Sequence, residues 1–115
     1  MRRGDICLVN LDPIIGSEAN KRHPCVVVSN DNANESAAAH GRGVITVVPL
    51  TSNTDRVFPF QVFLAADETG LDRDSKAQAE QIRSVDVRRV GPTIGHVPLD
   101  KMLEIGSALR LHLQL

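Results

Sequence analysis

The chain has 115 residues, a formal net charge of −1 and 42% hydrophobic residues. This length suits one domain with its own core, so we expect a single domain over residues 1–115. No stretch has the roughly 18–20 apolar residues of a membrane span, and the N-terminus lacks the apolar run and cleavage site of a signal peptide. We therefore predict a cytoplasmic protein with no membrane contact.

The aromatic content limits how this chain could bind RNA. It has no Trp or Tyr and only three Phe. The stacking platforms of many single-strand RNA binders cannot be built on that scale, so phosphate contacts and hydrogen bonds would have to carry RNA recognition. The net charge argues neither way, because binding depends on how basic residues cluster. They cluster at 2–3, 21–22, 83 and 88–89.

Short apolar segments rich in Val and Ile recur along the chain, bounded by Gly, Pro, Asn and Asp, which is typical of strands. They span residues 5–11, 25–29, 44–50, 60–64, 76–83 and 85–90. The second and third are apolar on both faces, as central strands are. The fourth would place Phe60, Val62 and Leu64 on one half-buried face. We predict a compact, strongly bent sheet or barrel.

Two helices are expected beside the sheet. The C-terminal one, residues 98–115, opens with Pro98 in the first turn and Asp100 near its positive end. Its apolar side chains recur at helical spacing: Leu99, Met102, Leu103, Ile105, Leu109 and Leu113. A shorter helix over residues 31–39 would be capped by Asn30 or Asp31. The predicted class is mainly β with helical additions (α+β).

Two further features need weighing. Cys7 and Cys25 lack the spacing of a zinc or redox motif and are expected to be buried core thiols. The run "GSEANKRHP" at 16–24 concentrates hydrogen-bonding and ionisable side chains between two apolar segments. In an arbitrary protein such a run is usually a solvated loop.

Taken with its neighbours, that run matches a known pattern. The pattern consists of "RGDI" (3–6), "LDP" (11–13), "GSE" (16–18), "KRHP" (21–24), "VVVSND" (26–31), "PLTS" (49–52), "DS" (74–75), "EQIRSVD" (80–86) and "IG" (94–95). In the order and spacing of these motifs the chain resembles the MazF/PemK family, the toxin halves of bacterial type II toxin–antitoxin pairs. It implies an SH3-like barrel of the MazF/PemK/CcdB type with a C-terminal helix.

The resemblance also implies an activity and partners. The protein would be a homodimer that cuts single-stranded RNA at short sequences without a metal or other cofactor, inhibiting translation and growth. A cognate MazE-like antitoxin would block the RNA groove with its acidic C-terminal tail, so that RNA and antitoxin exclude each other. Two positions depart from the family pattern: Cys7 stands where Trp is usual, and His23 where Arg is usual.

Cleavage of this kind begins with attack of the 2′-OH on the adjacent phosphate and leaves 2′,3′-cyclic phosphate and 5′-OH ends. It needs a base, an acid, and cations or donors around the phosphorane. We expect Arg22 to stabilise the phosphate and His23 to act as acid or base, since imidazoles as a class titrate near neutral pH. By the family pattern, Thr51 and position 23 are most tied to activity.

Further side chains are expected to assist catalysis or to bind RNA. Glu18 would act as a base or position a neighbour, and Glu80 matches an acidic position implicated in some members. The expected RNA-binding residues are Ser17, Asn20, Lys21, Ser52, Gln81 and Arg83. Because Glu80 and Gln81 would face opposite sides of a regular strand, a bend or bulge is needed for both to reach RNA.

Several alternatives stay open. Thr51 and Ser52 could be turn formers that bond their own backbone, and Glu80 with Arg83 could be a surface pair of little consequence. The rival function is a weakened or non-catalytic binder of the same fold, such as a gyrase poison, although the C-terminus "LRLHLQL" lacks the terminal Trp of such poisons. A peptide-binding SH3-like module is disfavoured by the scarcity of aromatics.

Overall fold

The structure is a computed structural model that describes residues 1–11 and 22–115. Its strands are β1 (Asp5–Asn10), β2 (Arg22–Val27), β3 (Val44–Thr51), β4 (Gln61–Leu64), β5 (Ser75–Gln78), β6 (Arg83–Asp86) and β7 (Val90–His96). Its helices are α1 (Asp31–His40), α2 (Ala66–Thr69) and α3 (Leu99–Leu113), with short 3₁₀ turns η1 (Ala79–Gln81) and η2 (Val87–Arg89).

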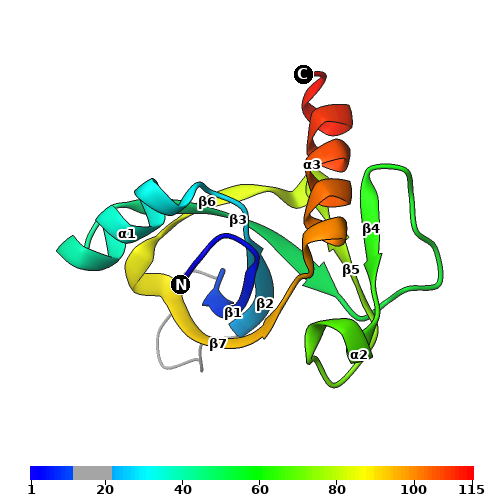
Figure 1. Ribbon diagram of the computed structural model, residues 1–115, viewed down its shortest axis with the longest axis horizontal. Coiled ribbons are helices and arrows are strands. Elements are labelled where there is room, and N and C mark those ends of the chain that lie inside the picture. Colours follow the sequence, from blue (N-terminus) through cyan, green and yellow to red (C-terminus); the bar gives the residue numbers. More distant parts are fainter. Residues whose placement is uncertain (12–21) are drawn as a thin grey trace, which may run out of the picture.

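In the described part of the chain the strands form one antiparallel sheet in the order β4-β5-β3-β2-β1-β7, and β6 also pairs with β3. Strand β3 organises the bend. Its first half pairs with β6 and its middle with β2, while its last two residues pair with β5. Figure 1 shows the sheet curling round on itself, with α3 standing beside it. The predicted class, mainly β with helical additions, is confirmed.

The central strands bury both faces, as the apolar runs predicted. Alternate residues enter two separate clusters, so Val26 packs in one and Cys25 with Val27 in the other. The first cluster lies under α3 and includes its Met102 and Ile105. The second includes Ala37 of α1. This two-sided burial fixes the positions of β2 and β3. The polar residues described below lie where β2 begins and where β3 ends.

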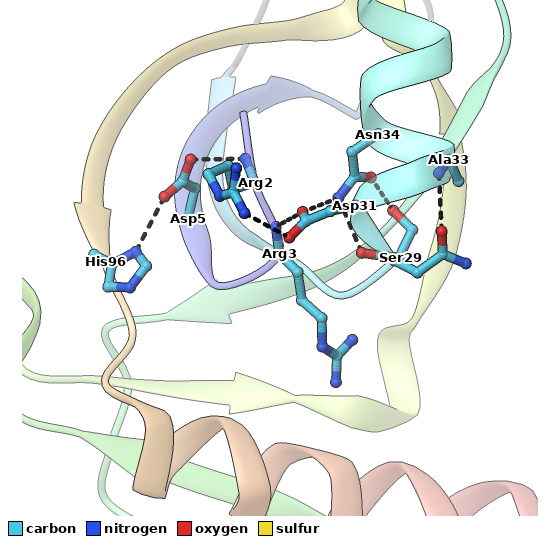
Figure 2. Close-up of polar contacts among 9 residues, drawn as sticks. Arg2, Arg3, Asp5, Ser29, Asp31, Ala33, Asn34 and His96 are labelled. Atoms are coloured by element: carbon cyan, nitrogen blue, oxygen red, sulfur yellow. Dashed lines mark hydrogen bonds and ion pairs between the residues drawn. The ribbon is translucent and has the colours of Figure 1, made fainter.

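Helix α1 confirms the expected helix at 31–39. Asn30 is its cap, accepting a hydrogen bond from the Ala33 amide at 2.8 Å, and Gly41 ends it in the left-handed region at φ 63°. Polar contacts anchor the helix to the N-terminal segment (Figure 2). Asp31 accepts from the Arg3 amide at 2.7 Å, and the buried Asn34 donates to the Ser29 carbonyl at 2.9 Å.

Helix α3 confirms the predicted C-terminal helix, but fewer of its apolar side chains are buried than predicted. Pro98 is the cap residue and not part of the first turn. Met102, Ile105 and Ala108 are buried, whereas Leu99 and Leu103 are 77% and 67% exposed, contrary to the broad apolar stripe predicted. Leu113 is exposed as well.

Two predicted strands are shorter than expected, and one strand was not predicted. The expected strand at 76–83 is broken by η1, and the expected strand at 85–90 by η2. Strand β7 was not predicted, because Gly91, Pro92 and Gly95 indicate turns. β7 pairs only with β1 among the described strands, and an edge strand tolerates proline. A Cβ at Gly95 would lie 2.6 Å from the Thr69 carbonyl oxygen, so close packing of β7 on α2 requires glycine there.

Candidate active site

One cavity gathers three of the predicted site residues. It has a volume of about 400 Å³, and His23, Thr51 and Ser52 line it. His23 is the second residue of β2 and Thr51 the last of β3, so the two strands bring together side chains that are 28 positions apart in sequence. His23 is half-buried.

The same cavity holds polar residues that the sequence did not single out. Asp72 and Arg73 come from the loop between α2 and β5, and Ser75 is the first residue of β5; all three line the cavity with His23. Arg73 is exposed and carries a guanidinium, the group best suited to bind a phosphate through two hydrogen bonds. No spacing rule links residue 73 to residue 23, so only the fold identifies it. Leu50, Leu71 and Ile94 supply apolar walls.

The Thr51 side chain lines the cavity and also stabilises the turn that follows β3. Its Oγ1 accepts a hydrogen bond from the Asn53 amide at 3.2 Å, so the turn-forming alternative is correct for this residue. That bond uses an oxygen lone pair and leaves the hydroxyl hydrogen to donate elsewhere. The turn therefore fixes the oxygen while the donor stays available to a ligand.

Arg22 does not share this cavity. Neighbouring residues of a strand project to opposite faces, and Arg22 lines a second cavity of about 490 Å³ with Asn10, Arg88, Arg89 and Gly91. The expected cluster of Arg22, His23 and Thr51 is therefore split between two sites. The positive charge expected of Arg22 beside His23 is supplied there by Arg73.

The predicted site residues at 80–83 do not line the His23 cavity. The bend needed between Glu80 and Gln81 exists as η1, but neither residue lines the His23 cavity. Glu80 accepts a hydrogen bond from the Gln61 side chain at 2.6 Å. Among the described ion pairs there is none between Glu80 and Arg83, so the surface-pair alternative is wrong. Arg83 and Gln81 are exposed.

Four predicted site residues lie outside the described part of the chain. They are Ser17, Glu18, Asn20 and Lys21. Their assignments stay predictions.

The two cysteines are buried, as expected. Cys7 and Cys25 stand opposite each other across β1 and β2, and both thiols are free. Burial raises the pKa of Cys25 to about 12, and it also raises the pKa of Cys7. Cys7, at the position where Trp is usual, therefore contributes to the core and presents no surface to a ligand.

Within residues 1–11 and 22–115, no three His, Cys, Asp or Glu side chains gather into a group that could hold a metal ion. No helix in those ranges is long and apolar enough to cross a membrane.

The class of protein is thus a small, mainly β domain with a curved antiparallel sheet, a C-terminal helix and a polar cavity where β2 begins and β3 ends. Residues 2–113 match the family described as PemK-like, MazF-like toxin of type II toxin-antitoxin system. The chain belongs to this family, which confirms the resemblance drawn from the sequence.

Individual proteins similar to this chain belong to the same family. The chain is 57% identical over 115 residues to a Mycobacterium tuberculosis protein named endoribonuclease MazF9, covering all of this chain and 98% of the relative. Among solved structures, MazE-MazF (Form-II) from Deinococcus radiodurans matches with a TM-score of 0.78 at 26% identity, covering 100% of this chain and 96% of the other. Mycobacterium tuberculosis toxin MazF-mt6 matches with a TM-score of 0.77 at 19% identity, covering 96% and 97%, and supports the fold alone.

Proposed function

We propose that this protein is the endoribonuclease toxin of a type II toxin–antitoxin system and cuts single-stranded RNA at short sequences. The observation that carries the proposal is the cavity shared by His23, Thr51, Ser52 and Arg73. It combines a proton carrier, two hydroxyl donors and a guanidinium in one place, and these are the groups that phosphodiester cleavage needs. The 57% identity to an endoribonuclease over the whole chain supports the same reading.

The proposed reaction is internal transesterification. The 2′-OH attacks the adjacent phosphorus, the bond to the 5′ oxygen of the next nucleotide breaks, and the products carry 2′,3′-cyclic phosphate and 5′-OH ends. His23 moves a proton at the attacking or leaving oxygen. Thr51 and Ser52 donate hydrogen bonds to the phosphorane, and the Arg73 guanidinium neutralises its charge. No metal or other cofactor takes part in this scheme.

The proposed partners follow from the family. The protein acts as a homodimer, and a MazE-like antitoxin inhibits it by laying an acidic tail over the RNA groove. A solved relative at 26% identity is described as a MazE-MazF assembly, which supports an antitoxin partner. Glu18 and Glu80 are kept as proposed catalytic residues. The proposed RNA contacts besides Ser52 are Ser17, Asn20, Lys21, Gln81 and Arg83.

The proposal is tested by incubating the purified protein with a long defined RNA in EDTA and mapping the ends. We expect cuts at one repeated short sequence with cyclic phosphate at each new 3′ end. Intact RNA together with stalled DNA gyrase would instead support the rival function, a non-catalytic poison of the same fold.

A further inference from the structure

The second cavity, lined by Arg22 and Asn10, has features of a ligand site that the reaction scheme above does not use. It measures about 490 Å³ and lies on the side of β2 away from the His23 cavity. Four charged side chains line it: Arg22, Asp86, Arg88 and Arg89. With three arginines and one aspartate, the cavity has a net positive charge.

Arg22 provides the charge that a ligand could use. Asp86 already neutralises Arg88 through two contacts, Nε to Oδ1 at 3.0 Å and Nη2 to Oδ2 at 2.8 Å. The Arg22 guanidinium makes no hydrogen bond or ion pair with any side chain or carbonyl in the described part of the chain. Its guanidinium lies against β7, because a Cβ built on Gly91 would come within 3.1 Å of Arg22 Nη1. Glycine at 91 thus makes room for it.

Asn10 is the second, independent observation. Its side chain is only 9% exposed, and its Oδ1 is buried with no hydrogen-bond partner within the described residues. Buried amide groups in folded proteins are almost always bonded, so an orphaned one that lines a cavity indicates a ligand that supplies the missing donor.

We propose that this cavity binds one ribonucleotide of the RNA strand away from the cut, with its phosphate on Arg22 and a hydroxyl or N–H of the same nucleotide on Asn10. A nucleotide offers an anion and a donor together, and the ribose 2′-OH is itself both donor and acceptor. A carboxylate side chain has no donor of its own, so a peptide would have to supply one from its backbone, whereas one nucleotide carries a phosphate and the 2′-OH on the same ribose. The inference rests on the proposed RNA cleavage, and it changes Arg22 from a catalytic residue into a binding residue.

The test measures binding separately from cleavage. A fluorescent, mixed-sequence single-stranded RNA is titrated by anisotropy over a series of KCl concentrations, on the Thr51→Ala background, which retains every group of the Arg22 cavity. Arg22→Ala is compared with Arg110→Ala, a matched loss of one exposed arginine on α3. We expect Arg22→Ala to weaken binding about tenfold, as loss of a charged hydrogen bond does. The slope of log K against log salt should fall by about 0.7, the value for one phosphate of single-stranded nucleic acid.

Asn10→Leu supplies a second readout that a merely structural role would not give. Removing the unpaired acceptor should leave the melting temperature unchanged or higher while RNA binding weakens. Equal affinities and slopes for Arg22→Ala and Arg110→Ala would overturn the subsite even if wild-type protein cuts RNA. Loss of affinity for an acidic peptide alone would also overturn it, by assigning the cavity to a protein partner. The expected changes without any cleavage by wild type would uphold the subsite and refute the nuclease.

Discussion

At the scale of single residues, the decisive feature is that adjacent side chains on one strand serve different cavities. Arg22 and His23 are neighbours in sequence, yet only His23 meets Thr51 and Ser52. Spacing identified His23 and Thr51 as belonging together, because His23 lies just before the apolar run of β2 and Thr51 just after the apolar run of β3. The face each residue takes depends on strand register, and the partnership with Arg73 depends on a loop 50 positions away.

Thr51→Ala should lower the single-turnover rate of RNA cleavage by about 10²- to 10³-fold, the usual effect of losing one transition-state donor. RNA affinity should change little, because the donor acts mainly on the phosphorane. Thr54→Ala removes a hydroxyl from the same loop outside the cavity and is the matched control. Equal rates for the two variants would exclude Thr51 from the reaction.

Cys25 makes stability depend on alkaline pH. Its pKa in the folded protein is raised to about 12 by burial, while a thiol in the unfolded chain titrates near 8.5–9. Below pH 9 both states hold the proton, and above it only the folded state does. The free energy of unfolding should therefore fall as pH rises from about 9 towards 12, by about 1–2 kcal/mol at pH 10 from this group.

Urea unfolding at pH 7 and pH 10 checks this, with Cys25→Val as the comparison. The variant should lose less stability between the two pH values than wild type does, whatever its stability at pH 7. An identical pH dependence in both proteins would show that the Cys25 thiol does not titrate differently on unfolding.

At the scale of elements, strands with apolar runs and helices with caps could be predicted, and elements held by tertiary contacts could not. β2, β3, α1 and α3 have local signals that agree with the fold. β7 has glycine and proline within it, and its strand conformation comes from pairing with β1 and close packing at Gly95. The turn η1 breaks the strand pattern because β5 and β6, on either side of it, pair with opposite ends of β3. The turn η2 lies where the chain passes from β6, which pairs with β3, to β7, which pairs with β1.

Helix α1 is held by polar contacts more than by an apolar face. Asn34 is fully buried, and its Nδ2 donates to the Ser29 carbonyl and to Asp31, while Ser29 Oγ donates to its Oδ1 at 2.6 Å. Asn34→Ala would remove these three hydrogen bonds to half-buried partners and should cost about 1–3 kcal/mol of unfolding free energy. Chemical denaturation measures it.

Asn32→Ala is the control for that substitution, because Asn32 is exposed on the same helix and alanine is the better helix former. It should leave stability unchanged or slightly increased. Equal effects of the two substitutions would mean that the contacts of Asn34 in Figure 2 add nothing to stability.

At the scale of the whole molecule, the curved sheet (Figure 1) brings distant segments together. Neighbouring residues of β2, Arg22 and His23, line two different cavities. Family membership and the overall fold could be inferred from the order of short motifs along the chain. The separation of Arg22 and His23 into two cavities could not be inferred, because motif order carries no information about the face of a strand on which a side chain lies.

The central claim is that RNA is cut by its own 2′-OH in the His23, Thr51 and Ser52 cavity. The most direct test is single-turnover cleavage of two short RNAs that carry the mapped cut sequence. They differ only by a 2′-deoxy substitution at the nucleotide 5′ to the cut. We predict that both bind with similar affinity and that only the unmodified RNA is cleaved, leaving a cyclic phosphate. Cleavage of the 2′-deoxy RNA at the same position would contradict the account.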